Sequence, residues 1–565
     1  MNRRQLIGMG ARVLSVAGAG PLLVSEVRAA GASRYEPSFA LLDRYVERYL
    51  IEMNAPGLTL ALADASGVQR VAAYGLDNLA LRRPLDVNEL FHIGSITKSF
   101  TALLLLQLHD EGKLDFERPV ADYLPGLRLD GATRPISAHD LLTHGAALPD
   151  GPLFPGNPAF RHRATAAPGT FFHYCNMGYE TLGLLIEALD KRSFAESLRA
   201  RILGPLGMTS TEPVITLDIL GKLANSYSVE QGDRPYPRQG ALSSAPAIVM
   251  TAASGCIAST ARDMGNYLTM LINRGRFGAT RAASEDGFRR FSTRHIAAEE
   301  FGPGASYGYG IAIDTLDGHV RLRHTGGMVS FASALEVDLD SGVGVFASVN
   351  SMQGYRPRPV AGYALQLLRA CRDQAALPEP PAPVPPLRVE KAGDYAGHYA
   401  GARRALDVIA EGDRLYLVVP GGRAALEPAP GVEDGFIVHD TEFGHFPLVF
   451  TRGGANHEGA AVEAGWGPEW FAGPGYQGTR DFPVPTEWQR YPGHYRNEDP
   501  WIGSVTVVIR KGQLWLNGTV PLALAEGTRF WLRDEPESPE WVSFEDVVGG
   551  RAMRLTLSGA DLKRT

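Results

Sequence analysis

Six prolines within a short stretch divide this chain into two parts. They are Pro378, Pro380, Pro381, Pro383, Pro385 and Pro386. Proline fixes its own φ angle and has no backbone N–H, so this stretch suits neither a helix interior nor a central strand. We expect an extended, stiff linker over residues 376–390. Because 565 residues are too many for one ordinary core, the two sides should fold as separate units.

The part before the linker mixes helical and strand patterns. Apolar periodicity predicts helices over residues 96–111 and 178–190. Short apolar or alternating runs predict strands over residues 58–63, 67–74, 320–324, 331–338 and 343–349. We therefore expect a mixed unit over residues 35–375, in which helices flank a sheet.

The part after the linker repeats itself. Tyr-Ala-Gly-His-Tyr at 395–399 is echoed by Tyr-Pro-Gly-His-Tyr at 491–495, amid short strands and Gly/Asp/Asn turns. This predicts two related, antiparallel, barrel-like β modules over about 391–483 and 486–565. We interpret the two His-Tyr pairs as structural residues that open each module, not as a site.

The N-terminus has the pattern of an export signal. Arg3 and Arg4 precede an apolar, Gly/Ala-rich run to about Val24, and Val27-Arg28-Ala29 offers small residues for cleavage. The run is too short to span a bilayer. We expect residues 1–30 to lie outside the fold and the protein to be periplasmic. The paired arginines resemble a twin-arginine signal, and an ordinary secretory signal is the alternative.

Composition excludes several classes of function. Hydrophobic residues make up 44% of the chain, charged residues 21%, and the formal net charge is -7. Without clustered lysine and arginine, we expect no nucleic-acid partner. The apolar run at residues 103–106 is too short to span a membrane, and we place it in an amphipathic helix. Three cysteines without zinc spacing predict no disulfide framework, no metal and no cofactor.

The first candidate catalytic motif is Gly94-Ser95-Ile96-Thr97-Lys98, at the start of a predicted helix. Positions i and i+3 share a helix face, so the Ser95 hydroxyl and the Lys98 amine should meet. The helix N-terminus adds free N–H groups and partial positive charge. Ser-x-x-Lys also occurs by chance, but only seven of the 55 basic residues are lysines. Unlike arginine, a lysine with a depressed pKa can act as a base.

Two further motifs fit the same chemistry. The Tyr174 phenol can pass a proton to a leaving group, and the Asn176 amide can bind a substrate carbonyl and hold the lysine. His324-Thr325-Gly326-Gly327 ends a predicted strand, and its glycines let a substrate lie close to the backbone. The N–H groups of Gly327 and Ser95 could form an oxyanion hole. The plain alternative is a Gly-rich turn with a structural histidine.

Together these motifs resemble the serine β-lactamase and D,D-peptidase superfamily, within its class C-like branch. The resemblance covers about residues 40–370 and rests on the segments 91–98, 140–144, 168–170, 174–176, 259–264 and 324–327. It implies an α+β fold, with an antiparallel sheet, a helical region and the site between them. It implies Ser95 as nucleophile and Lys98 and Tyr174 as proton carriers. It also implies substrate binding by Asn176, His324, Thr325 and Gly326.

Three other polar residues lie in these segments. We interpret His139, His144 and Asp263 as structural. A Ser-His-Asp triad built from them is a rival hypothesis. It lacks a Gly-x-Ser-x-Gly elbow, and Ser95 has closer helpers in the sequence.

Two departures from the family pattern bear on substrate. Cys175 stands where the family usually has serine, and His324 replaces the lysine of the third motif in β-lactamases. A histidine near its reference pKa is largely neutral at neutral pH, so we expect weaker recognition of penicillin-type carboxylates. This histidine and the two trailing β modules resemble esterase and D-aminopeptidase members.

The sequence therefore predicts a serine hydrolase that cleaves an amide or ester through a Ser95 acyl-enzyme. The leading form is a D-aminopeptidase-like peptidase or an esterase acting on a small-molecule or short-peptide substrate. One alternative is a β-lactamase or D,D-carboxypeptidase acting on cell-wall-type substrates. The other is a catalytically idle binding or assembly protein. A β module that inserts a loop into the cleft would restrict substrates to small ones.

Overall fold

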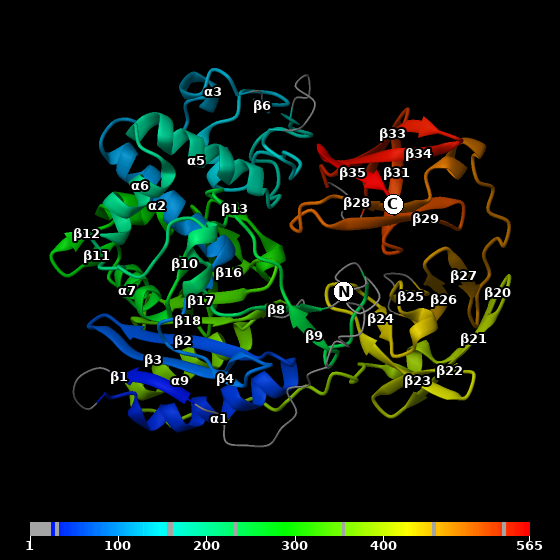
Figure 1. The fold of residues 1–565 in the computed structure, drawn as a ribbon, viewed down its shortest axis with the longest axis horizontal. Helices are drawn as coiled ribbons and strands as arrows, with labels where there is room; N and C mark the ends of the chain where they lie inside the picture. Colours follow the sequence, from blue (N-terminus) through cyan, green and yellow to red (C-terminus); the bar gives the residue numbers. More distant parts are fainter. Residues whose placement is uncertain are drawn as a thin grey trace, which may run out of the picture.

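The chain folds into one mixed α/β unit and two closed β-barrels (Figure 1). The computed structural model describes residues 24–28, 33–127, 129–154, 162–229, 234–352, 356–454, 459–533 and 538–565. The two barrels lie one above the other on the same side of the mixed unit in Figure 1. This confirms the predicted fold class. Across the described residues, every helix is too short or too polar to cross a bilayer.

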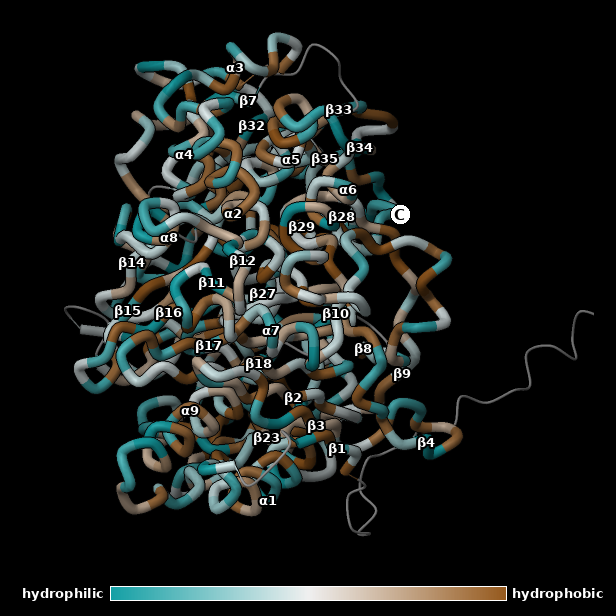
Figure 2. Tube along the Cα trace, turned by 90° about the vertical axis from the view of Figure 1, so that its left-hand side faces the viewer, coloured by the Kyte–Doolittle hydropathy of each residue, from teal (hydrophilic) through white to brown (hydrophobic). Residues whose placement is uncertain are grey.

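A large antiparallel sheet forms the centre of the mixed unit. Its strand order is β1 (Val24–Arg28), β3 (Gly67–Asn78), β2 (Gly57–Asp64), β18 (Val343–Val349), β17 (Ala332–Asp338), β16 (His319–Gly327), β15 (Ala312–Leu316), β14 (Ser306–Tyr307) and β13 (Ile296–Ala297), with β4 (Arg83–Pro84) beside β3. Every residue of β2 and β18 is buried, because helices cover both faces. Figure 2 shows hydrophobic residues along these central strands.

Two helical layers cover the sheet. The helices α1 (Glu36–Met53) and α9 (Arg358–Asp373) pack on one face. On the other face lie α2 (Thr97–Asp110), α5 (Asn176–Asp190) and α7 (Ala261–Ile272). The shorter helices are α3 (Val120–Tyr123), α4 (Ala138–Leu142), α6 (Phe194–Leu198) and α8 (Glu285–Phe291).

Short strand pairs complete the mixed unit. They are β5 (Phe91–His92) with β10 (Ala258–Ser259), β6 (Leu129–Asp130) with β7 (His162–Arg163), β11 (Arg276–Phe277) with β12 (Thr280–Arg281), and β8 (Tyr227–Val229) with β9 (Leu242–Ser244) and β19 (Ser351–Met352). Strand β5 leads directly into the turn that carries Ser95.

The predicted helices and strands are confirmed, but one helix does not have the amphipathic pattern expected of it. The helix at 96–111 is not amphipathic: eleven of the fourteen residues of α2 are buried. The helices α5, α6 and α8 all pack against it, so each side of α2 faces protein. A helix enclosed in this way is apolar on all sides, which explains the run of leucines.

Both β modules close into eight-stranded barrels, which confirms the predicted repeat. Barrel 1 contains β20 (Gly397–Gly401), β21 (Ala405–Glu411), β22 (Arg414–Val419), β23 (Gly422–Pro428), β24 (Gly435–Val438), β25 (Leu448–Arg452), β26 (Ala461–Trp466) and β27 (Glu469–Ala472). Barrel 2 contains β28 (Gly493–Arg496), β29 (Ser504–Arg510), β30 (Gln513–Leu516), β31 (Val520–Glu526), β32 (Arg529–Leu532), β33 (Trp541–Val548), β34 (Arg551–Leu557) and β35 (Ala560–Arg564). Residues 375–385, ahead of barrel 1, form neither helix nor strand.

The repeated tyrosines have the same role in each barrel. The buried Tyr399 donates its hydroxyl to the Tyr395 carbonyl at 2.8 Å, and the buried Tyr495 donates to the Tyr491 carbonyl at 2.7 Å. The neighbouring His398 is exposed and lies 2.7 Å from Asp407. These pairs are structural, as the sequence indicates.

Part of the N-terminal segment differs from what the sequence predicts. Most of residues 1–30 lie outside the described residues, but Val24–Arg28 forms the edge strand β1. The expectation that the whole segment lies outside the fold is therefore wrong for these five residues. The strand pairs with β3 along its length, and its Glu26 carboxylate lies 2.8 Å from the fully buried guanidinium of Arg70, which also pairs with Asp43. A buried cation needs such a partner.

Candidate active site

Ser95 lies in a single 3₁₀ turn, Gly94–Ile96, between β5 and α2. The strand β16 passes unusually close to this turn. A Cβ atom on Gly94 would lie 2.8 Å from the Gly327 amide nitrogen, and one on Gly326 would lie 1.9 Å from the Ile93 carbonyl oxygen. Gly94 also has a φ of 53°, which favours glycine. The glycines therefore bring the Ser95 turn against the end of β16.

This close approach gives a first testable prediction. Gly326→Ala should lower the free energy of unfolding by about 1–3 kcal/mol, because the new methyl group overlaps the Ile93 carbonyl. The hydrolytic rate should fall as well, since β16 must move away from Ser95. Thermal unfolding and ester hydrolysis measure the two effects. Gly362→Ala, in α9 with open space around it, is the matched control and should be neutral or stabilising. Equal behaviour of the two variants would contradict the role of close packing.

Lys98 is fully buried in the first turn of α2, and its amine has three oxygen neighbours. The Nζ atom lies 3.0 Å from Ser95 Oγ, 2.7 Å from Asn176 Oδ1 and 2.8 Å from the Ser254 carbonyl oxygen. The last two oxygens only accept hydrogen bonds. A neutral amine that donates its two hydrogens to them keeps its lone pair for the Ser95 hydroxyl. The geometry thus orients Lys98 as a base toward Ser95.

The charge state of Lys98 suits that role. Burial lowers its pKa to about 7, although the carboxylates of Asp150 and Glu180 act in the opposite direction. Around neutral pH a large fraction of the amine is therefore uncharged. An ordinary surface lysine would be fully protonated there.

Asn176 is held in place by Asp150. The Asn176 Nδ2 atom donates to Asp150 Oδ2 at 2.8 Å, which leaves Oδ1 to accept from Lys98. The other Asp150 oxygen accepts from the backbone N–H groups of Asn176 and Met177, at 2.7 and 3.1 Å. Asp150 thereby satisfies the free N–H groups at the start of α5 and fixes the amide that faces Lys98.

The ring of Tyr174 forms one wall of the site. The Lys98 amine lies 4.7 Å from its centroid, and the His144 ring stacks on it at 4.3 Å. Burial raises the pKa of Tyr174, and a side-chain hydrogen bond with Ser95 opposes that shift only in part. Tyr174 is therefore a phenol at neutral pH, and a phenol can donate a proton near Ser95.

His324 is buried and neutral. Burial lowers its pKa to about 3, helped by the charge of Lys98. Its Nδ1 atom lies 2.7 Å from the Thr325 carbonyl oxygen, which can only accept, so Nδ1 carries the hydrogen. Its Nε2 atom then accepts from the Tyr307 hydroxyl at 2.9 Å. His324 therefore offers no positive charge to a substrate.

The structure does not assemble the rival Ser-His-Asp triad. The His144 Nδ1 atom accepts from the Cys175 N–H at 3.0 Å, and the His139 Nδ1 atom lies 2.9 Å from the Tyr309 hydroxyl. Asp263 accepts from Ser210 and Thr211, at 2.8 Å each. The three residues thus have separate structural partners. The cysteines Cys175, Cys256 and Cys371 are all free.

Four residues of the site were not singled out from the sequence. They are Asp150, Ser254, Tyr307 and Arg356, which hold Asn176, Lys98 and His324 or lie against Gly327. None of them belongs to a local motif, and each reaches the site through long-range packing. No pattern in the sequence identifies them.

Barrel 2 takes part in the walls of the site. The Glu540 carboxylate accepts from the Asp150 backbone N–H at 2.6 Å and lies 2.8 Å from His173 Nε2. The segment 497–503 between β28 and β29 carries Trp501 and Ile502, which line two cavities beside the site. One cavity, of about 820 Å³, also contacts Asn176. The other, of about 1130 Å³, reaches Gly327.

Among the described residues, one group has metal-ligand chemistry. His319, Asp338 and Asp340 bring their ligand atoms within 4.8 Å of one another at the far end of β16. Asp338 already lies 3.2 Å from Arg369, and His319 lies 3.1 Å from Asp338. These contacts account for the group as a structural ion-pair cluster. Ser95 lies at the other end of the strand, against Gly326 and Gly327.

Comparison with known proteins agrees with this geometry. A profile of the Beta-lactamase family matches residues 42–370. Penicillin-binding protein 4 of Amycolatopsis lactamdurans is 28% identical over 199 residues, which are 33% of this chain and 52% of that protein. Penicillin-binding protein 4* of Bacillus subtilis is 28% identical over 27% of this chain and 37% of its own length. The chain thus spans about half or less of these relatives.

A solved structure shows the same fold over most of the chain. The octameric penicillin-binding protein homologue from Pyrococcus abyssi aligns with a TM-score of 0.56 and 24% identity, over 77% of this chain and 99% of that one. The family profile alone covers more than half of the sequence. The chain therefore belongs to the Beta-lactamase family, within the serine β-lactamase and D,D-peptidase superfamily.

Proposed function

We propose that the protein is a serine hydrolase that cleaves an amide or ester through an acyl-enzyme on Ser95. The observation that supports this most directly is the 3.0 Å contact between Ser95 Oγ and a buried Lys98 amine whose pKa is lowered to about 7. Nucleophilic serine needs an adjacent base in its neutral form. A catalytically idle protein has no need to bury a lysine in this way.

In the first half of the reaction, neutral Lys98 takes the Ser95 proton as Oγ attacks the substrate carbonyl. The Ser95 and Gly327 N–H groups stabilise the oxyanion that forms. The Tyr174 phenol gives its proton to the leaving amine or alkoxide and recovers one from Lys98. In the second half, water gives one proton to neutral Lys98 as it attacks the ester carbonyl, the C–O bond to Ser95 breaks, and Lys98 passes that proton to Oγ.

The preferred substrates in this proposal are D-amino-acid amides or short esters. Neutral His324 supports them over penicillins, because the side chain at the lysine position of the third motif is uncharged; the cation that lies against Gly327 is Arg356. The barrel 2 segment 497–503 supports small substrates, because Trp501 and Ile502 line both cavities beside the site. Small substrates would fit the remaining cavities of about 820 and 1130 Å³.

A rate panel tests the proposal. It compares a short-chain p-nitrophenyl ester, a D-alanine p-nitroanilide and a chromogenic cephalosporin. We expect turnover of the ester or the anilide and slow turnover of the cephalosporin. Fast cephalosporin hydrolysis would replace the esterase or peptidase assignment with a β-lactamase. No turnover of any of the three, with no acyl adduct detected by intact-protein mass spectrometry, would contradict the hydrolase proposal.

A further inference from the structure

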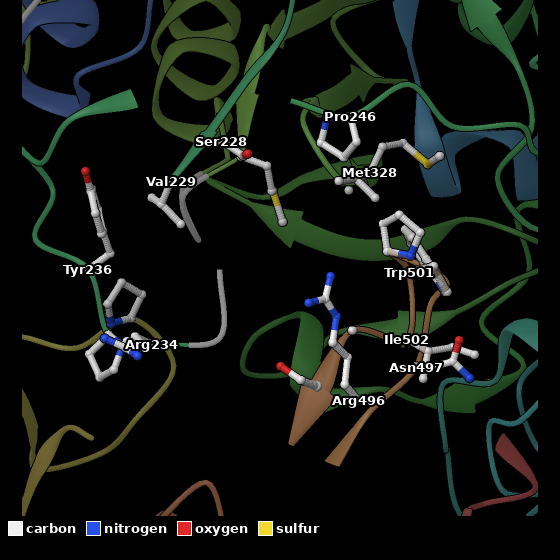
Figure 3. Close-up of a pocket in the computed structure, with 18 of the residues that line it drawn as sticks. Ser228, Val229, Arg234, Tyr236, Pro246, Met328, Arg496, Asn497, Trp501 and Ile502 are labelled. Atoms are coloured by element: carbon white, nitrogen blue, oxygen red, sulfur yellow. The ribbon is translucent and has the colours of Figure 1, made fainter. Parts of the chain in front are cut away.

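Barrel 2 meets the mixed unit at two places near the active site. At one of them, Trp501 and Ile502 of barrel 2 line the cavity beyond the end of β16 (Figure 3). At the other, the turn at Ser558 packs directly on Gly151, where an added Cβ atom would lie 1.8 Å from the Ser558 carbonyl oxygen. This second contact leaves no room for a side chain, so it holds barrel 2 tightly against the loop that contains Asp150.

Glu540 makes the polar part of this second contact. It comes just before β33, and its largely buried carboxylate accepts three hydrogen bonds. The donors are the Asp150 backbone N–H at 2.6 Å, His173 Nε2 at 2.8 Å and the Ser558 hydroxyl. Because an ionised carboxylate only accepts hydrogen bonds, the His173 Nε2 atom carries a hydrogen. One carboxylate of barrel 2 therefore joins two segments of the mixed unit.

A continuous chain of hydrogen bonds leads from Glu540 to the base of the proposed reaction. Asp150 gives its backbone N–H to Glu540 and uses its carboxylate on the other partner, accepting from Asn176 Nδ2 at 2.8 Å. Asn176 Oδ1 in turn accepts from the Lys98 amine at 2.7 Å. The position of the Asp150 backbone thus decides where the Asn176 amide lies.

The Asp150 backbone depends on Glu540 for this position. Across the segments that the structure describes, the Asp150 N–H has Glu540 as its one hydrogen-bond partner. If the Asn176 amide turned away, Lys98 would lose one of the two acceptors that leave its lone pair facing Ser95. A misplacement of about 1 Å by a residue far from the chemistry can lower a rate about 10²-fold.

We propose that Glu540 is a positioning residue, which fixes Asp150 and through it the Asn176 amide that directs the lysine toward the nucleophile. This rests on the proposed function and deepens it, because barrel 2 then contributes to the rate of the chemical step and not only to the walls of the site. The Glu540 carboxylate is itself held from both sides, by His173 of the mixed unit and by Ser558 of barrel 2. It acts through Asp150 and not on the reacting atoms.

Three substitutions of Glu540 separate geometry from charge. Glu540→Gln keeps the length of the side chain, and its Oε1 atom can still accept from Asp150 while its amide donates to Ser558, so kcat on a p-nitrophenyl ester should stay within about threefold of wild type. Glu540→Asp keeps the charge but withdraws the carboxylate by one methylene, and Glu540→Ala removes the acceptor. We expect kcat to fall about tenfold in the first and about 10²-fold in the second, with KM within about threefold of wild type.

The control for these variants is Glu545→Ala. It removes another carboxylate of β33, which pairs with Arg554, and kcat should match wild type. An unchanged kcat in Glu540→Ala would overturn the proposal. A loss in Glu540→Gln as large as that in Glu540→Asp would overturn it too, because charge and not position would then matter.

A double-mutant cycle distinguishes positioning from a general effect on the fold. Asn176→Ala removes the amide that Glu540 is proposed to hold. Adding Glu540→Ala to that protein should therefore lower kcat by no more than about threefold further. If the two losses multiply, Glu540 acts by another route and the proposal is wrong.

Amide hydrogen exchange gives a readout that needs no turnover. The backbone N–H groups of Asp150, Asn176 and Met177 all belong to this network. They should exchange about tenfold faster in Glu540→Ala than in wild type, and at the wild-type rate in Glu545→Ala. Equal exchange in Glu540→Ala and wild type contradicts the positioning role, even if the protein is an active hydrolase. Faster exchange in a protein that hydrolyses no ester supports the role and places the failure in the proposed function. Glu540→Asp serves for the same comparison if Glu540→Ala does not fold.

Discussion

Ser95→Ala is expected to lower kcat by about 10⁴-fold or more on whichever ester or amide the protein hydrolyses. The substitution removes the only atom that can form the acyl bond in the proposed reaction. Lys98 keeps its contacts with Asn176 and Ser254, so the fold and the binding of substrate should survive. Steady-state kinetics measures the loss, and intact-protein mass spectrometry with a slow ester shows whether the acyl adduct disappears.

The control for this variant is Ser210→Ala. Ser210 is exposed and contributes only its backbone N–H to a neighbouring carboxylate. It should leave both the rate and the adduct unchanged. If Ser95→Ala instead retained the adduct or more than about a tenth of wild-type kcat, another nucleophile would be at work. The assignment of Ser95 would then be wrong.

The local part of this site is predictable from the sequence, and the long-range part is not. Ser95 and Lys98 meet because they are three residues apart at the start of one helix, which is a property of helical geometry. The closeness of Gly326 to Ile93 follows only from the sheet and the turn packing together. The same is true of Asp150, whose carboxylate orients Asn176 from a separate loop.

The sequence motifs also do not show which charged side chains lie beside the site. A histidine at position 324 predicts that the third motif lacks the usual lysine charge. Burial lowers the pKa of His324 to about 3, so this side chain is uncharged at neutral pH. Arg356 then approaches Gly327 from the segment before α9, a position that nothing near residue 324 indicates. Likewise, the leucine run of α2 indicates a helix, but only the packing of α5, α6 and α8 around it shows that no side faces water.

The rate of hydrolysis should depend on pH through the protonation of Lys98. Because its pKa is lowered to about 7, Lys98 is mostly protonated below that pH and cannot accept the Ser95 proton. We therefore expect kcat/KM to rise with pH through an acid limb centred near 7. Lys98→Arg should lower kcat/KM by about 10²–10⁴-fold at every pH, because arginine stays protonated and high pH cannot restore a base.

Two further variants make this prediction sharper. Lys113→Arg changes an exposed lysine paired with Glu111 and should keep both the rate and the acid limb. Glu180→Gln removes a carboxylate that raises the pKa of Lys98 when it is ionised. Because burial raises the pKa of Glu180 itself to about 7, the acid limb should move only slightly to lower pH while the plateau is retained. A pH profile of kcat/KM, measured on one ester for all four proteins, decides the matter. An acid limb that moves to higher pH in Glu180→Gln, or a Lys98→Arg protein that recovers its activity at high pH, would show that a group other than Lys98 is the base.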